Sequence, residues 1–149
     1  MTGFHIVAAN LIEKDGEYLL VKEGKEEVRG LWNLPAGGVK ECEKISSTAR
    51  REAKEEAGLE VEIEGLVGVF MDESDRSERT VIIFVFHSRP QSYDVEAPDN
   101  DEILEADFFS KEEFQDMKIR IPFLEEAVKR YENGELVETD IIQDFRGEI

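Results

Sequence analysis

The sequence contains little cysteine and no long apolar run, and each absence excludes a class of protein. With a single cysteine, Cys42, the chain cannot form an internal disulfide, and no zinc-type cluster of cysteine and histidine is present. The longest apolar run, residues 81–86, is far shorter than the roughly 20 residues that a membrane-spanning helix needs. No basic residue precedes the apolar N-terminal stretch, as one would in a secretory signal. We therefore expect a soluble cytoplasmic protein without a membrane partner.

Positive charge is also scarce. The chain has 18 lysines and arginines against 36 aspartates and glutamates, a net charge of -18. This charge repels DNA, RNA and anionic membranes, so polymeric nucleic acid is disfavoured as a partner. A small phosphorylated substrate would be repelled too, unless bound cations reverse the local field. The charge balance therefore points to a metal at any site that binds phosphate.

The order of expected elements indicates a mixed α+β fold. The 149 residues fit one domain, and no repeat or linker divides residues 1–149. Alternating or continuous apolar residues predict strands, and apolar residues at helical spacing with capping signals predict helices. We expect a hairpin of residues 4–12 and 17–23, strands at 31–34, 61–71, 79–88 and 103–109, and helices at 45–57, from Ser110 and at 122–132.

The helix expected at residues 45–57 carries the pattern with the clearest chemical meaning. Alanines recur along it at a spacing of four, and Gly58 is placed to end it. Glu52, Glu55 and Glu56, at positions i, i+3 and i+4, share one face. Like charges at this spacing destabilise a helix, so the glutamates need open solvent or a cation. Carboxylate oxygens suit hard cations such as Mg²⁺ or Mn²⁺.

The residues around these glutamates support a metal site. Arg51 lies one helical turn from Glu55, close enough to orient its carboxylate. Before the helix, Gly37 and Gly38 let the loop backbone turn tightly, so a loop carbonyl can join the ligand set. A metal held there polarises a phosphoryl oxygen and lowers the pKa of bound water.

The simpler interpretation is a solvated acidic helix face, which a chain this rich in glutamate produces by accident. The full pattern is longer than three glutamates. It consists of a glycine, five residues, a glutamate, seven residues, and then Arg-Glu-apolar-x-Glu-Glu-x-Gly-apolar. From the residue frequencies of this chain, a chance match arises roughly once in 10⁵ sequences. The length of the pattern therefore favours a functional motif.

At these positions the sequence resembles the Nudix family. The residues that match its signature are Gly37, Glu43, Arg51, Glu52, Ala53, Glu55, Glu56, Gly58 and Leu59. The resemblance implies an α/β/α sandwich with a mixed β-sheet, and hydrolysis of a nucleoside diphosphate linked to another group, by attack of water at phosphorus. It also implies that Glu52, Glu55, Glu56 and the Gly37 carbonyl hold Mg²⁺ or Mn²⁺. Arg51 would brace the carboxylates, and Glu43 would support the site from the loop.

The family varies in its general base, so several candidates stay open. Glu52 and Glu56 are candidates on the helix; Glu102 is the preferred candidate on a later loop, and Glu105 the second. Two residues depart from the family pattern. Cys42 replaces the usual glycine before the loop glutamate, and Lys44 replaces the usual Ser or Thr at the helix start, so we expect the cap to come from Ser46 or Ser47.

Substrate-binding residues are predicted from residue type and place. Trp32 and Phe70 are candidates to stack on a base, and Asn33 to hydrogen-bond to it. Arg76 and Arg79, on a loop between strands, are candidates to bind phosphate. The alternatives are that Trp32 belongs to the core and that the loop has no role. His5 and His87 fall within strand patterns, and we interpret both as structural.

The segment Leu31–Gly37 is similar to Nudix enzymes that act on free nucleoside di- and triphosphates. Alternative substrates are ADP-ribose and other ADP-sugars, dinucleoside polyphosphates and capped RNA ends, the last disfavoured by the acidic charge. A different class of function is a ligand-sensing Nudix domain without hydrolysis, although such domains usually lack a signature glutamate. A homodimer is an expectation from the family alone.

Overall fold

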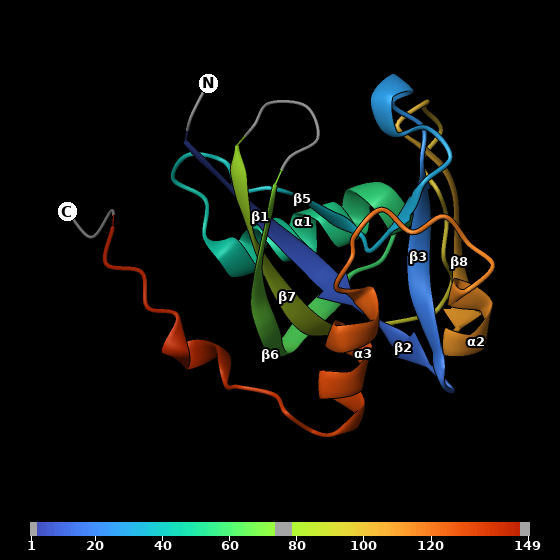
Figure 1. Cartoon of the computed structure of the whole chain (residues 1–149). Coiled ribbons are helices and arrows are strands. Elements are labelled where there is room, and N and C mark those ends of the chain that lie inside the picture. The colour runs from blue at the N-terminus through green and yellow to red at the C-terminus, as the bar shows by residue number, and fades with distance from the viewer. Residues whose placement is uncertain (1–2, 74–78, 147–149) are drawn as a thin grey trace.

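The computed structural model describes residues 3–73 and 79–146. Two β-sheets form the centre of the protein (Figure 1), and each has four strands. The first sheet has the order β5 (Ala36–Gly38), β1 (Phe4–Leu11), β7 (Thr80–Pro90) and β6 (Val61–Glu73). Strands β1 and β7 run parallel, whereas β1 and β5, and β6 and β7, run antiparallel. The sheet is therefore mixed, as expected from the sequence.

The second sheet is arranged around β3 (Glu17–Glu23). This strand pairs antiparallel with β2 (Glu13–Lys14), β4 (Trp32–Asn33) and β8 (Ile103–Ser110). The four strand segments expected after the hairpin correspond to β4, β6, β7 and β8, with small shifts of their ends. The segment expected at 31–34 is shorter, Trp32–Asn33. Strand β5, on the glycine-rich loop, was not predicted.

The predicted hairpin is right at its turn and wrong in one strand. Asp15 and Gly16 both have positive φ, of 50° and 84°, as the turn of a tight hairpin requires, and they connect β2 to β3. Strand β1 instead leaves this hairpin at Ile12 and lies between β5 and β7 in the other sheet. Residues 8–12 are buried, which suits a strand covered on both faces.

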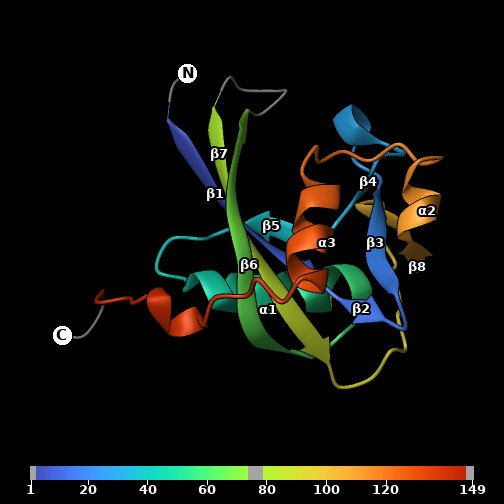
Figure 2. The ribbon, with the colours of Figure 1, turned by 60° about the horizontal axis from the view of Figure 1, so that its bottom comes forward.

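Helices cover both faces of the first sheet (Figures 1 and 2). Helix α1 (Ile45–Ala57) packs on the side of Ala8 and Phe86, and α3 (Leu124–Glu132) packs on the side of Ala9 and Val85. The short helix α2 (Lys111–Phe114) and the 3-10 turns η1 (Glu26–Val28) and η2 (Thr139–Ile141) complete the described elements. The result is the expected α/β/α sandwich. None of the helices in the described ranges is long and apolar enough to cross a membrane.

The ends of the helices test the capping predictions. Gly58 ends α1 in the left-handed conformation, with φ of 70°, and Ser110 and Glu113 form the predicted capping box of α2. The predicted cap of α1 by Ser46 or Ser47 is wrong, because the residue at the cap is Lys44 and no side chain caps the helix. Helix α3 begins at Leu124, two residues later than predicted.

Candidate active site

A cavity of about 560 Å³ lies beside α1 and collects most of the residues predicted to act on substrate or metal. Helix α1 borders it on one side. Strands β1, β5, β6 and β7 and the loops after β3, before β8 and before α3 also contribute to its lining. These segments are distant in the sequence, and the two sheets bring them together. The predicted residues that line it are Asn33, Gly37, Arg51, Glu52, Glu55, Glu56 and Glu102.

Gly37 lies directly against Glu52. A Cβ atom built on Gly37 would overlap the carboxylate of Glu52, so any larger residue would displace that carboxylate. The φ angle of Gly37 is not in the left-handed region, so close approach, rather than backbone conformation, explains the glycine. The backbone of β5 therefore lies against the Glu52 carboxylate. The sequence predicted the Gly37 carbonyl to lie beside the glutamates.

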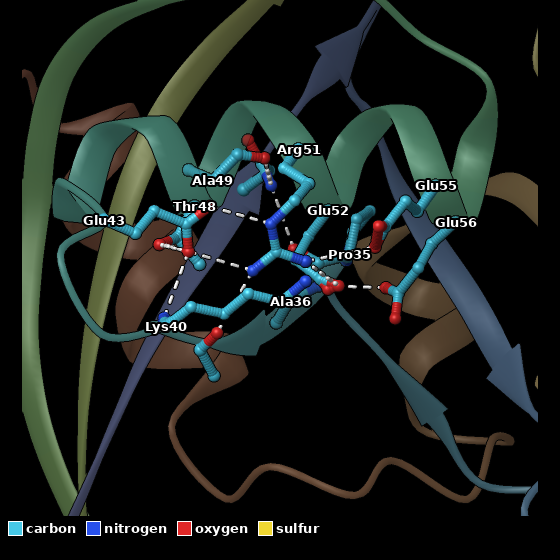
Figure 3. A network of polar contacts seen from close by, with 12 residues as sticks. Pro35, Ala36, Lys40, Glu43, Thr48, Ala49, Arg51, Glu52, Glu55 and Glu56 are labelled. Atoms are coloured by element: carbon cyan, nitrogen blue, oxygen red, sulfur yellow. Dashed lines mark hydrogen bonds and ion pairs between the residues drawn. The ribbon is translucent and has the colours of Figure 1, made fainter.

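Arg51 lies among the acidic side chains of α1 (Figure 3). Its Nη1 donates to Glu55 Oε2 at 3.1 Å and lies 3.5 Å from Glu52 Oε1. Its Nη2 donates to the Gly38 carbonyl at 3.2 Å, which ties the helix to β5. The guanidinium group thus fixes the orientation of two of the three helix glutamates and neutralises part of their charge.

Glu43 anchors Arg51 from the loop. The carboxylate accepts from Arg51 Nε at 2.8 Å and Nη2 at 3.0 Å, from the Thr48 hydroxyl at 2.6 Å and from the Lys40 amide at 3.1 Å. These donors favour the ionised form, and the Arg51 guanidinium above all lowers the pKa of Glu43 to about 2. Glu43 is therefore an ionised support for the site, with its oxygens already occupied.

Glu52 and Glu56 carry charge at high cost. Burial first, and then the neighbouring charge of Glu55, raise the pKa of Glu52 to about 7. Burial, followed by the charge of Glu52, raises the pKa of Glu56 to about 9, although the Ala36 amide donates to its Oε1 at 3.0 Å. A bound cation would relieve this repulsion, so the site suits one electrostatically.

The donor set fits Mg²⁺ or Mn²⁺ by its chemistry. The oxygens available are the carboxylates of Glu52, Glu55 and Glu56 and the backbone carbonyl of Gly37, all hard ligands. Within residues 3–73 and 79–146, no three acidic, histidine or cysteine side chains converge into a complete ligand set. Mg²⁺ usually takes one or two carboxylates and fills its other positions with water and substrate phosphate. An incomplete protein set is therefore compatible with this ion.

A buried amide connects the loop before β5 to α1. Asn10, which is fully buried, donates through Nδ2 to the carbonyls of Pro35 at 3.1 Å and Ala49 at 2.9 Å. Its Oδ1 accepts from the Ser88 hydroxyl at 2.7 Å. These bonds fix the distance between the start of β5 and the helix, and hence between Gly37 and the glutamates. The sequence interpretation overlooked Asn10, whose polarity within an apolar strand was the available signal.

The opposite wall of the cavity contains residues that the sequence did not indicate. Segment 118–121 is held beside β4, since the Trp32 amide donates to the Lys118 carbonyl and the Arg120 amide to the Trp32 carbonyl, each at 2.8 Å. Arg120 also donates through Nη1 to Glu23 at 2.6 Å. The apolar part of the wall consists of Val81, Ile83, Ile121 and Phe123.

Two predicted base-stacking residues do not line this cavity. The ring of Phe70 is stacked on that of Phe123, with centroids 4.4 Å apart and planes 5° apart. Trp32 meets Phe109 edge to face at 4.8 Å and belongs to the same apolar cluster. The rings of Trp32 and Phe70 thus pack on other aromatics and do not line the cavity, whereas Phe123 does.

The remaining predicted residues lie elsewhere. Arg79 is near His5, whose pKa is lowered by burial and then by the Arg79 charge, and it does not line the cavity. Arg76 lies outside the described residues. Glu105, the second candidate for the base, pairs with Lys22 at 3.3 Å and also lies away from the cavity. His87 packs against the ring of Tyr131, with centroids 4.7 Å apart.

Asn33, the candidate for hydrogen bonding to a base, lines the cavity. Its Oδ1 accepts from the Leu34 amide at 2.8 Å, and its Nδ2 lies 3.5 Å from Glu23 Oε2. Glu102 is exposed and also lines the cavity, with its backbone carbonyl accepting from the Gly24 amide at 2.8 Å. Both side chains are therefore accessible from the space beside the α1 glutamates.

Comparison with known proteins adds an independent observation. The sequence model of one family, described as NUDIX domain, matches residues 2–130. The 8-oxo-dGDP phosphatase NUDT18 of Homo sapiens is 40% identical over 86 residues, which are 58% of this chain and 25% of that protein. The ADP-ribose pyrophosphatase of Methanocaldococcus jannaschii is 32% identical over 104 residues, 70% of this chain and 60% of that protein. The chain therefore spans only part of the length of these relatives.

A solved structure extends the likeness over the whole fold. The NUDIX hydrolase from Nitrosomonas europaea superposes with a TM-score of 0.88 at 28% sequence identity. The match covers 98% of this chain and 100% of that one. The arrangement of sheets and helices around the cavity is thus that of a known fold.

Proposed function

Because the chain belongs to the NUDIX family, we propose that it is a metal-dependent hydrolase that splits the diphosphate linkage of a nucleoside diphosphate derivative. One observation carries the proposal. Glu52, Glu55 and Glu56 of α1 and Gly37 of β5 border a single cavity, and Arg51 orients the carboxylates from within it. The opposite wall is apolar at Phe123 and can receive a base.

The glutamates and the Gly37 carbonyl would hold Mg²⁺ or Mn²⁺. When bound, the ion supplies charge neutralisation at the phosphate oxygens and a water of lowered pKa. The residues of this chain supply the rest. Arg51 holds the carboxylates in place, and the carboxylate of Glu102, exposed on the loop before β8, would accept the proton of the attacking water. Water oxygen bonds to one phosphorus, and the bridging oxygen leaves with the other phosphate.

The apolar wall would position the nucleoside. Val81, Ile83 and Phe123 offer a surface for a base, and Asn33 offers an amide that both donates and accepts hydrogen bonds. The names of the relatives indicate two substrates to test first. These are 8-oxo-dGDP, from the NUDT18 relative, and ADP-ribose, from the archaeal relative.

The test is a screen for release of phosphate, nucleoside monophosphate or sugar phosphate, with Mg²⁺ and with Mn²⁺. It covers 8-oxo-dGDP, canonical nucleoside di- and triphosphates, ADP-ribose and dinucleoside polyphosphates. The Glu56→Gln variant should lose almost all turnover. Glu60→Gln is the matched control, because Glu60 is exposed just beyond α1, where its carboxylate pairs with Lys54 at 3.3 Å.

Two outcomes would contradict the hydrolase. Turnover that persists in Glu56→Gln would place the reaction elsewhere. Tight binding of a nucleotide by the wild type with no product from any compound would instead favour a ligand-sensing domain. A folded protein that neither binds nor hydrolyses these compounds would reject this substrate class.

A further inference from the structure

More acidic than basic side chains line the cavity, although its proposed ligand is itself an anion. Among the described residues, four basic side chains line it: Lys25, Lys40, Arg51 and Arg120. The acidic ones are Glu23, Glu52, Glu55, Glu56, Asp72, Glu73 and Glu102. A bound metal would offset part of this excess. A diphosphate also needs positive groups that no carboxylate already neutralises.

Both arginines of the cavity are already engaged. Arg51 is shared among Glu43, Glu52 and Glu55, with its nearest contact to Glu43 at 2.8 Å. Arg120 is held by Glu23 at 2.6 Å. By contrast, the ammonium groups of Lys25 and Lys40 make no hydrogen bond or ion pair with any other residue in the described ranges. The positive charge available to an incoming anion is therefore that of lysine.

Lys25 is the lysine placed to act at the reacting end. Lys25 and the candidate base Glu102 line the same cavity as the α1 glutamates, and the hydrogen bond from the Gly24 amide to the Glu102 carbonyl joins their two loops. Lys25 lies on the loop that follows β3, whereas Lys40 follows β5 on the same side as Arg51. Lys25 therefore shares with the α1 glutamates the cavity in which a phosphate would lie.

Backbone hydrogen bonds hold the loop around Lys25 in place, whereas the Lys25 side chain is exposed. The Gly24 amide donates to the Glu102 carbonyl at 2.8 Å, and a Cβ on Gly24 would overlap the Asp101 carbonyl. The Val28 amide donates to the Lys25 carbonyl at 3.0 Å, which closes η1. The loop of Lys25 is thus attached to the loop of Glu102. An exposed side chain on an anchored backbone can reach a ligand at small conformational cost.

We propose that Lys25 binds the non-bridging phosphate oxygens of the substrate diphosphate and determines affinity for it. An ammonium group is a compact charge with three donors, which suits oxygens on neighbouring phosphates. The inference deepens the proposed function and rests on it for the nature of the substrate. The binding of diphosphate itself can be measured without any turnover.

The test uses magnesium pyrophosphate as the probe, titrated calorimetrically into the full chain. Lys25→Gln should weaken binding about tenfold, and Lys25→Arg should restore most of it. Lys129→Gln, an exposed lysine of α3 away from the cavity, should bind as the wild type does. Affinity of Lys25→Gln should also depend less on salt than that of the wild type.

Binding of pyrophosphate by Lys25→Gln with unchanged affinity would overturn the inference, as would failure of the wild type to bind it. Kinetics separate this result from the fate of the hydrolase. If the wild type hydrolyses a nucleotide, Lys25→Gln should raise KM more than it lowers kcat. If no nucleotide is hydrolysed but Lys25→Gln still weakens pyrophosphate binding, the hydrolase proposal fails and the role of Lys25 stands.

Discussion

The guanidinium group of Arg51 binds the carboxylate of Glu43 through two hydrogen bonds, from Nε at 2.8 Å and from Nη2 at 3.0 Å. The remaining nitrogen of the same group donates to Glu55. A residue of the loop therefore sets the position of the arginine, and the arginine sets the position of the helix carboxylates. Two-point attachment of this kind fixes both distance and plane, which a single ion pair does not.

The first prediction concerns Glu43, the loop residue that holds Arg51. Glu43→Gln removes one charge and cannot accept both hydrogen bonds from Arg51, so the arginine is held less firmly beside Glu55. Supporting residues of metal sites typically contribute 10- to 100-fold to metal affinity or activity. We expect a loss in that range in the Mg²⁺ dependence of turnover. Glu41→Gln, an exposed change two residues away, should behave as the wild type; equal losses in both variants would contradict the proposed support.

The second prediction follows from the pKa of Glu43, which hydrogen bonds from Arg51 lower to about 2. A lowered pKa stabilises the folded state above the ordinary value near 4.5, and this stability is lost as pH falls toward 2. At neutral pH, Glu43→Gln should lower the free energy of unfolding by on the order of 2 kcal/mol. Urea titrations of both proteins without metal should converge between pH 4.5 and pH 2. A difference that stays constant with pH would contradict this account.

Most of the α1 side of the site could be predicted from the sequence, because it depends on local geometry. The spacing of Glu52, Glu55 and Glu56 places them on one helical face whatever surrounds the helix. These glutamates and Gly37 line one cavity because β5 lies close to the helix. In the sequence, the two adjacent glycines indicated that this backbone could lie beside the glutamates. Gly58 likewise predicted the end of α1 from its own conformational freedom.

The opposite wall could not be predicted, because it depends on contacts between distant segments. Phe123 reaches the cavity since residues 118–121 pair with Trp32, almost ninety positions earlier in the chain by their numbering. Aromatic residue type alone made Phe70 and Trp32 equally plausible as base-stacking groups. Tertiary packing decides among them, as Phe70 and Trp32 meet other rings whereas Phe123 borders the cavity.

The third prediction tests which aromatic ring contacts the base. Phe123→Leu keeps an apolar side chain but removes the aromatic face, so it should raise KM for a nucleotide several-fold with a smaller change in kcat. Phe70→Leu disturbs the same stacked pair from outside the cavity. It should lower stability without a comparable rise in KM. If Phe70→Leu raises KM more than Phe123→Leu does, the base contacts Phe70 and not Phe123.

The fourth prediction concerns the buried amide of Asn10. Asn10→Leu leaves the Ser88 hydroxyl and the carbonyl of Pro35 without side-chain partners in a fully buried place. The Pro35 carbonyl keeps its hydrogen bond from the Asn10 backbone amide at 2.9 Å, so the Ser88 hydroxyl is the group left unsatisfied, and a loss of about 1–3 kcal/mol is expected. Thermal and urea unfolding measure it. Ser88→Ala removes only one bond and should cost less, and the double variant should cost less than the sum of the two.

The last prediction uses the close approach of Gly37 to Glu52. In Gly37→Ala the new methyl group meets the Glu52 carboxylate, which must rotate away from β5. The backbone of residue 37 tolerates alanine, because its φ lies outside the left-handed region, so the fold should survive with little change in melting temperature. Metal-dependent turnover should fall by at least tenfold, since the displaced carboxylate no longer shares its region with the backbone carbonyl. Gly65→Ala is the control, because a Cβ there makes an ordinary contact of 3.4 Å with Leu136. Full activity of Gly37→Ala would show that the position of Glu52 beside β5 is not required for the reaction.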